Sequence, residues 1–513
     1  MTKPSPAIDV ARGATFLITQ TIVTAVISLA AFAVIARALT REDMGILAVL
    51  TLVANGAQVL SGLGVGSTAT QFVATLQGQG DPDNTSRAGY SCLIINASMT
   101  TVVASVTFFS ANSLALYLLG TASRAIFFRL LTWEVAALGV NYSLSSLLLG
   151  LKRFRNYSLA YMIAFAIRQS AVVALLILGM GLPGVLVGWG IGDSFLSLLL
   201  AAYVRKALGP FRFGFGFVKL LRFSSPLFFG EVATFAYLYF DRILLIPLVS
   251  LAQLGAYNVA VTAYGVLNGV PSSISSALFP FYSHFYAGGT KASSARDLEN
   301  AVKTASRYVS FLTVPLAVGL AVTSLPAATL LAGRNYGDAA YPLAVLSVFL
   351  AIACLVRALS QIFVVLERTV TSAAVTIGSI LLPVLAAVLL IPHLGIVGAS
   401  VARGLSLITA LGFSIIILKK FLKLSFDTRA YGYVWLASIV MAAVTLAFEK
   451  VIYSEYLLPA YVLTGVAAFL FSLRFLRAVG THDMELLSNF LPQRLRFLAR
   501  WFAKVLGVGV RLD

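Results

Sequence analysis

The chain has 513 residues, of which 59% are hydrophobic and only 11% are charged, a balance that excludes an ordinary soluble globular protein and predicts a polytopic membrane protein. Its formal net charge is +18, but no polar stretch is long enough for a soluble nucleic-acid-binding domain, so nucleic acid is not a predicted partner. The two cysteines, Cys92 and Cys354, both lie in apolar runs and indicate neither a disulfide framework nor a metal site.

Apolar stretches long enough to cross a bilayer recur from the N-terminus to about residue 476. They predict an all-α, polytopic membrane protein of about 14 transmembrane helices. The first stretch is too long for the core of a signal peptide and further spans follow it, so we expect it to be retained. The predicted spans, in chain order, are 13–37, 44–67, 88–110, 125–150, 157–180, 182–204, 224–248, 254–282, 307–327, 339–366, 369–391, 394–418, 431–449 and 456–476.

Lysines and arginines gather in the segments that follow the even-numbered spans, for example in "LKRFRNY" at 151–157. Cytoplasmic loops carry such an excess of basic residues, so the pattern predicts a multi-pass protein of the cell (cytoplasmic) membrane with both termini in the cytoplasm. After Gly480, apolar and basic residues alternate at helical spacing. This predicts an amphipathic basic tail, 479–513, lying on an anionic leaflet.

Two weak sequence matches indicate an internal repeat. Gly45 and Gly255 align at an offset of 210, each opening a span, and 182–188 matches 393–399 at a similar offset. Repeated six-helix halves that run in the same direction are typical of alternating-access transporters, which bind substrate between the halves. The predicted organisation is a six-helix lobe (1–206), a cytoplasmic linker (207–223), a second six-helix lobe (224–420), two additional helices (421–478) and the tail.

Three arginines lie in the middle of apolar spans, where a charge is costly and is retained for function by default. Arg168 is flanked by small residues, and Arg357 and Arg403 lie on polar stripes. Because a guanidinium group suits phosphate, they predict a cationic cavity for an anionic ligand. In the alternative, the arginines pair with carboxylates such as Glu231, Glu134 or Asp193 and only hold helices together.

Other polar residues near the predicted spans are weaker candidates for lining the cavity or for coupling transport to an ion. Glu231 shares its span with Asp241 and Arg242, and its carboxylate could couple to protons. The remaining candidates are Gln20, Gln361 and Arg37. The histidines are scattered near span ends, and no cluster of residues predicts a metal or another cofactor.

Three segments carry a family resemblance: "IARALTREDMGILAVLTLVANGAQVLSGLGVG", "FSSPLFFGEVATFAYLYFDRILLIPLVSLAQLGAYNVAV" and "LLAGRNYGDAAYPLAVLSVFL". They resemble the polysaccharide-transporter (Wzx-type) flippases of the multidrug/oligosaccharidyl-lipid/polysaccharide (MOP) superfamily. The likeness rests on Arg37 with Gly45, on Asp241 followed by Gly255 and Tyr257, and on Asn335-Tyr336. It implies a V-shaped, two-lobed bundle that moves lipid-linked oligosaccharides, whose phosphate would be the anion met by the arginines.

The combined hypothesis is a flippase, not an enzyme, that moves a polyprenyl-phosphate- or diphosphate-linked oligosaccharide across the cytoplasmic membrane by alternating access. Its expected partners are this substrate, membrane lipids, and a glycan polymerase or glycosyltransferases. A multidrug or cation antiporter of the same superfamily is the first alternative, disfavoured because 14–36 contains no Asp or Glu. A polyprenyl-dependent glycosyltransferase is the second, disfavoured because the outer loops are short.

Overall fold

The computed structural model describes residues 6–212, 214–287, 291–481, 503–504 and 506–508. All regular secondary structure in these ranges is helical, which confirms the predicted fold class. The chain divides into two compact units, residues 1–258 and 259–513. Most of the predicted tail, 479–513, lies outside the described residues.

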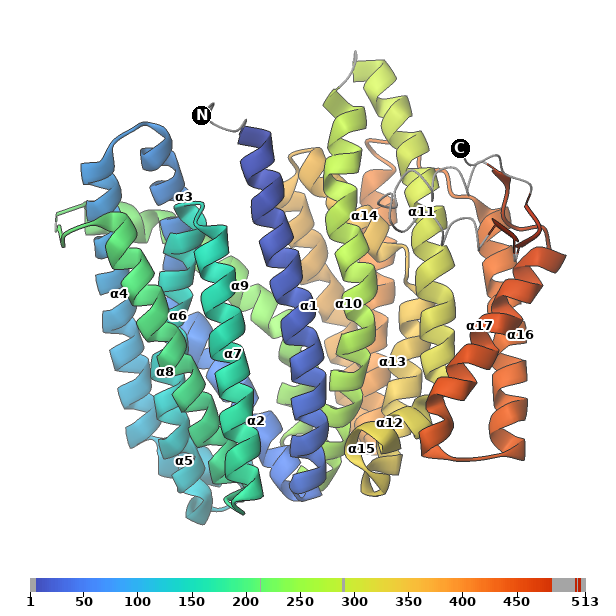
Figure 1. Cartoon of the computed structure of the whole chain (residues 1–513), viewed down its shortest axis with the longest axis horizontal. Helices are drawn as coiled ribbons and strands as arrows, with labels where there is room; N and C mark the ends of the chain where they lie inside the picture. The colour runs from blue at the N-terminus through green and yellow to red at the C-terminus, as the bar shows by residue number, and fades with distance from the viewer. Residues whose placement is uncertain (1–5, 213, 288–290, 482–502, 505, 509–513) are drawn as a thin grey trace. The chain divides into compact units, whose positions relative to one another are not determined.

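The described residues of unit 1 form nine α-helices and the start of a tenth, which are labelled in Figure 1. Long helices dominate it, and the shorter α3 and α5 follow α2 and α4 after tight turns. The helices are α1 (Pro6–Ala38), α2 (Arg41–Gly62), α3 (Val65–Gly78), α4 (Pro82–Phe109), α5 (Ala111–Leu119), α6 (Ala125–Gly150), α7 (Phe154–Ile177), α8 (Gly181–Leu208), α9 (Phe217–Leu245) and α10 (Leu251–Ala287), with a 3-10 turn, η1 (Ala122–Arg124), before α6.

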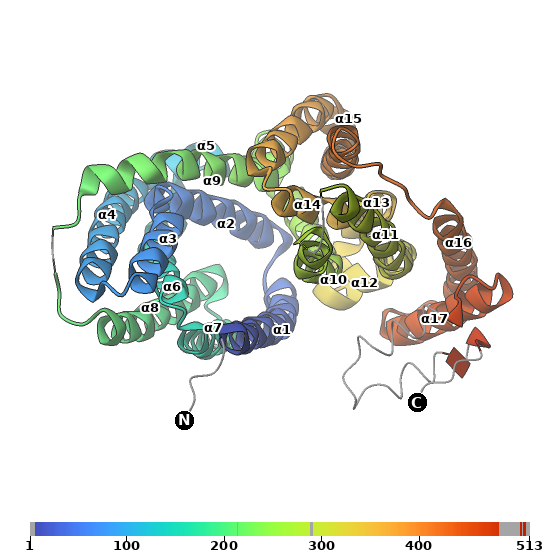
Figure 2. The same cartoon turned by 90° about the horizontal axis from the view of Figure 1, so that it is seen from above.

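Unit 2 contains the rest of α10 and the helices that follow it. Its last two long helices, α16 and α17, lie side by side (Figures 1 and 2). The elements are α11 (Lys291–Val322), α12 (Ser324–Ala332), η2 (Arg334–Ala339), α13 (Ala340–Ile352), α14 (Val356–Val365), α15 (Thr369–Leu418), α16 (Thr428–Val451), η3 (Glu455–Leu457) and α17 (Leu458–Phe475).

Each of the fourteen predicted spans falls on helix, but some boundaries differ. The span 44–67 ends early, because Leu63 and Gly64 both adopt left-handed backbone conformations before α3 begins. The span 339–366 is divided between α13 and α14. The spans 369–391 and 394–418 fall on one continuous assignment, α15, whose backbone leaves helical geometry at Gly395, where φ is +54°.

Ten of the described helical segments are long and apolar enough to cross a membrane by themselves. Helices α6 and α9 are not among these ten. They carry Glu134 and Asn141, and Glu231 and Asp241, respectively. Polar side chains in a bundle core lower the hydropathy of a helix and require partners on neighbouring helices. The polar side chains of α6 and α9 are therefore candidates for a functional site in unit 1.

Helices α6, α7 and α8 lie side by side in unit 1 (Figures 1 and 2). Glycines on α8 allow the approach: a Cβ atom at Gly188 would overlap Val172, and one at Gly192 would overlap Arg168. Small residues let membrane helices pack backbone to backbone, where lipid gives no hydrophobic drive for association. The α7–α8 contact therefore fixes the height of Arg168 against α8.

The first turns of α2 and α10 pack through a reciprocal glycine contact within unit 1. A Cβ atom at Gly45 would overlap the carbonyl oxygen of Leu251, and a Cβ atom at Gly255 would overlap that of Arg41. The two contacts exchange when the offset of 210 between Gly45 and Gly255 is applied, as at an isologous contact across a two-fold axis. This symmetry supports the repeat. The predicted lobe boundaries stay predictions. Helix α9, which was predicted to open the second lobe, packs on α2 and α3 and groups with unit 1.

The glycine contact predicts a large position effect on α10. Gly255→Ala is expected to destabilise the protein by about 1–3 kcal/mol, because a methyl group there forces two backbones apart. Gly265→Ala is the control, since no described atom lies within 4 Å of a Cβ atom at that position on the same helix. Thermal unfolding in detergent measures both. Equal melting temperatures for the two variants would contradict the close approach.

Candidate functional site

Arg168 of α7 is held by two carboxylates from the neighbouring helices of unit 1. Its Nη2 atom donates to Oε1 of Glu134 on α6 at 3.1 Å, and its Nε atom lies 3.3 Å from Oδ2 of Asp193 on α8. The guanidinium also lies over the ring of Trp189, 4.8 Å from its centroid. The three helices thus converge on one charged group.

This ion cluster is buried and its charges are unequal. The side chains of Glu134 and Asp193 are 1% and 9% exposed, whereas that of Arg168 is 19% exposed. Two ionised carboxylates would leave one negative charge uncompensated by Arg168, and an uncompensated buried charge is strongly unfavourable. Oε2 of Glu134 has no hydrogen-bond partner among the described residues. Arg168 alone therefore does not balance both carboxylates when both are ionised.

Of the three acids proposed as partners of Arg168, two contact it in the structure. Glu134 and Asp193 contact it, whereas Glu231 accepts hydrogen bonds from Tyr142 at 2.5 Å and from Ser67 at 3.2 Å. The role of Arg168 toward a substrate stays a prediction. Its partly exposed guanidinium remains accessible beside the two acids.

Glu231 joins three helices of unit 1: its own α9, α6 through Tyr142, and α3 through Ser67. The ring of Tyr142 fits against Gly62 and Gly66, where a Cβ atom would overlap it. The glycines thus place the phenol hydroxyl within reach of the carboxylate. Two hydroxyl groups therefore donate to one oxygen of this half-buried carboxylate.

Asp241 is fully buried on α9 and contacts Tyr257 near the start of α10. It accepts a hydrogen bond from the Tyr257 hydroxyl at 2.5 Å and one from the backbone N–H of Arg242 at 2.9 Å. The guanidinium of Arg242 instead lies over the Tyr239 ring, 5.3 Å from its centroid. These two adjacent candidates thus have separate environments.

The remaining candidates are distributed over both units. In unit 1, Gln20 is buried on α1 and Arg37 is exposed in the last turn of that helix. In unit 2, Gln361 donates to Ser275 at 3.3 Å and Arg403 is half-buried on α15. Arg357 lies on α14, but its side chain is outside the described part of the structure.

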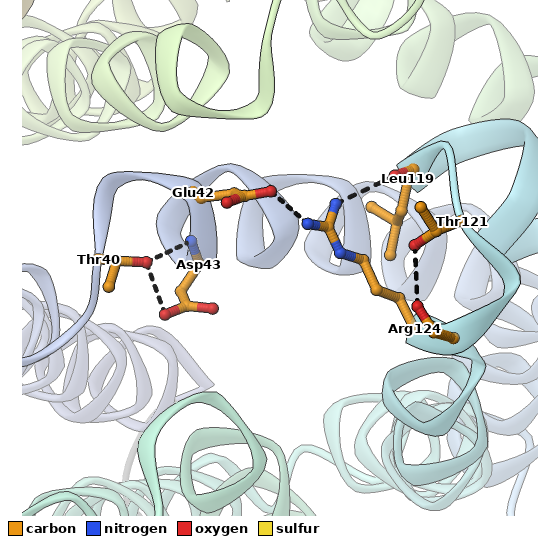
Figure 3. Close-up of polar contacts among 7 residues, drawn as sticks. Thr40, Glu42, Asp43, Leu119, Thr121 and Arg124 are labelled. Atoms are coloured by element: carbon orange, nitrogen blue, oxygen red, sulfur yellow. Dashed lines mark hydrogen bonds and ion pairs between the residues drawn. The ribbon is translucent and has the colours of Figure 1, made fainter.

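Sequence reasoning missed the ion pair between Glu42 and Arg124, which joins the start of α2 to the turn before α6 (Figure 3). Arg124 also donates to the carbonyl oxygen of Leu119 at 3.1 Å. The N-terminal cap of α2, beside this ion pair, follows from the sequence, because a threonine followed three residues later by an acid predicts such a cap. The Thr40 hydroxyl accepts a hydrogen bond from the N–H of Asp43 at 3.1 Å. The partner of Glu42 gave no sequence signal.

The ion cluster predicts a stability effect at Arg168. Arg168→Ala is expected to cost about 3–5 kcal/mol, because it leaves two buried carboxylates without a cation. A triple variant, Arg168→Gln with Glu134→Gln and Asp193→Asn, should recover most of that loss, and Arg155→Ala, an exposed site on the same helix, should cost little. Denaturation in mixed micelles measures all three. A normal unfolding free energy for Arg168→Ala would refute the pairing.

The chain is similar to known proteins both in sequence family and in fold. The family model described as "Polysaccharide biosynthesis protein" matches residues 10–286, which is more than half of the chain. The curated relative "Probable low-salt glycan biosynthesis flippase Agl15" of Haloferax volcanii is 20% identical over 244 residues, covering 48% of this chain and 51% of the relative. The chain thus spans about half the length of the curated relative it matches.

Solved structures show the fold. A "Lipid II flippase MurJ, inward closed conformation" aligns with a TM-score of 0.70 at 15% identity, covering 90% of this chain and 98% of that one. An inward-facing multidrug resistance MATE family transporter aligns with a TM-score of 0.63 at 16% identity, covering 78% and 96%. The chain therefore belongs to the polysaccharide biosynthesis protein family, as its resemblance predicts, and shares its fold with these two solved membrane proteins.

Proposed function

We propose that this protein is a flippase that moves a polyprenyl-phosphate- or diphosphate-linked oligosaccharide across the cytoplasmic membrane for the assembly of cell-surface glycans. The family match over residues 10–286 carries the proposal. It is supported by a curated relative named as a glycan biosynthesis flippase and by the fold shared with a lipid II flippase. The proposed orientation has both termini in the cytoplasm.

The hardest part of such a passage is the phosphate, because an unpaired anion in hydrocarbon faces a large desolvation cost. Arginine meets phosphate with paired, charge-assisted hydrogen bonds. We assign this role to Arg168, Arg357 and Arg403, the mid-span arginines. The glycan then occupies a hydrophilic cavity while the lipid chain stays in the bilayer, and no covalent bond changes.

The ion cluster offers a way to couple the phosphate to a proton. When Glu134 takes up a proton, one singly charged phosphate group of the substrate can replace its carboxylate beside Arg168 and leave the total charge of the site unchanged. Since Asp193 still holds the Nε side of the guanidinium, the arginine keeps its position during the exchange. Glu231, with its tyrosine and serine donors, is the second candidate for coupling.

A multidrug or cation antiporter is the second candidate function. The MATE fold likeness, with a TM-score of 0.63, favours it, and buried carboxylates are suited to bind a cation and a proton in turn. The sequence family speaks for the glycan substrate. A glycosyltransferase has less support, because the relatives named above are flippases and a transporter.

Transport in proteoliposomes separates the two candidates. The purified full chain is expected to expose a fluorescent polyprenyl-diphosphate oligosaccharide to an external quencher, because both leaflets become accessible when the lipid is flipped. Protein-free vesicles and vesicles with heat-denatured protein are the controls. Accumulation of ethidium without any movement of the glycan lipid would favour the antiporter and reject the flippase.

Variants of the ion cluster test its part in transport. Glu134→Gln, which mimics the protonated acid, should retain transport but lose its dependence on pH, whereas the unmodified protein should work better as the pH is lowered. The neutral triple variant Arg168→Gln, Glu134→Gln and Asp193→Asn should fold but transport at least roughly tenfold more slowly, as expected on losing a charged hydrogen bond. Full transport by the folded triple variant would remove Arg168 from the proposal.

A further inference from the structure

A cavity of about 570 Å³ opens in unit 2 where three helices meet, formed by α11, the start of α16 and the end of α17. Arg307 contributes from α11, Arg429 from α16 and Arg477 from the turn after α17. Among the described residues that line it, Asp427 is the one acid. Three arginines against one aspartate leave two positive charges in excess.

The depth of the cavity follows from the apolar segments beside it. The apolar segment of α16 begins at Thr428 and that of α17 ends at Phe475, so the lining residues near 427–430 and 476–481 lie at one edge of the apolar layer. Phospholipid phosphates lie just outside the hydrocarbon core. Basic pockets between helices at this depth on the cytoplasmic side are suited to anionic headgroups.

Two of the guanidinium groups are fixed in place. Arg307 lies 3.5 Å from Oδ2 of Asp427 and donates to the carbonyl oxygen of Ala478 at 3.2 Å. Arg429 donates through Nε to the Tyr433 hydroxyl at 3.0 Å, which directs the group without neutralising it. Since Oδ1 of Asp427 caps α16 through the N–H of Ala430, the aspartate has one oxygen for one arginine.

A second cavity, of about 730 Å³, shares part of its lining with the first. Arg477, Gly480 and Thr481 line both cavities, and Arg474 lines the second. Phe471 and Phe475, also in its lining, are 71% and 81% exposed. Arginine side chains beside an exposed aromatic surface complement a molecule with a phosphate head and hydrocarbon chains. A free phosphate would need only the arginines.

We propose that the cationic notch, defined as Arg307, Arg429, Arg474 and Arg477, binds the headgroup phosphate of an anionic glycerophospholipid from the surrounding leaflet. Arg307 and Arg429 receive the phosphate oxygens, and Phe471 and Phe475 contact the acyl chains. This site is separate in sequence and chemistry from the Arg168 cluster, and it is occupied by a resident lipid instead of the transported one. The lipid thereby links the middle of α11 to the start of α16 and the end of α17.

Lipid binding to the purified full chain in detergent tests the notch. Native mass spectrometry should show retention of phosphatidylglycerol over phosphatidylcholine. Each basic residue near a membrane surface is worth about 1 kcal/mol, so Arg429→Gln with Arg477→Gln should weaken phosphatidylglycerol binding roughly 30-fold. Lysine at both positions should restore part of it. The matched control, Arg153→Gln with Arg155→Gln, removes two exposed arginines at the start of α7 and should leave binding unchanged.

Size-exclusion elution confirms that each variant is folded, and if the double variant is not, Arg477→Gln alone should weaken binding roughly fivefold. Unchanged phosphatidylglycerol binding in the folded variants would overturn the proposal. So would displacement of the lipid by inorganic phosphate at matched concentration, which would identify a free-anion site. Displacement by the polyprenyl-diphosphate oligosaccharide but not by added phosphatidylglycerol would identify a substrate site and would overturn it equally.

Discussion

A charge that is removed from water must be matched by a partner, and unit 1 is organised around one such match. Arg168 meets Glu134 and Asp193 within 3.3 Å, and these residues come from α7, α6 and α8. The interaction specifies how the three helices are rotated and at what height they meet, because any slip leaves an acid unpaired in a low dielectric. Apolar packing alone would tolerate many such slips.

Glycine makes that match possible at short range. Gly192 lets the backbone of α8 approach Arg168, so the side chain of Asp193, the next residue, reaches the guanidinium. The contact between Gly45 and Gly255 follows the same principle at the start of two further helices. In both places the absence of a side chain brings polar groups, or polar backbone, into contact inside an apolar bundle.

The sequence predicted the helices well and the partners poorly, for identifiable physical reasons. Hydropathy marks each helix because every backbone group in lipid must be bonded within its own segment, so all fourteen spans fell on helix. It could not mark the break at Leu63, where an apolar residue adopts a left-handed conformation, or the division between α13 and α14. Mid-span position identified Arg168 as unusual, but its partners are set by helix rotation, which one sequence does not encode locally. Glu134 and Asp193 were therefore only candidates among several acids.

The different surroundings of Arg168 and of the cationic notch follow from their different depths in the apolar layer. At the edge of the apolar layer, a guanidinium can be left partly unpaired because water and headgroups solvate it, and the excess of charge in the cationic notch is stable there. In the bundle core the same excess of positive charge would be costly, and Arg168 is accordingly paired with two carboxylates. Under the proposed function, a phosphate can approach such an arginine when a carboxylate gives up its charge, so that proton uptake and phosphate binding at the cluster are two parts of one electrostatic requirement.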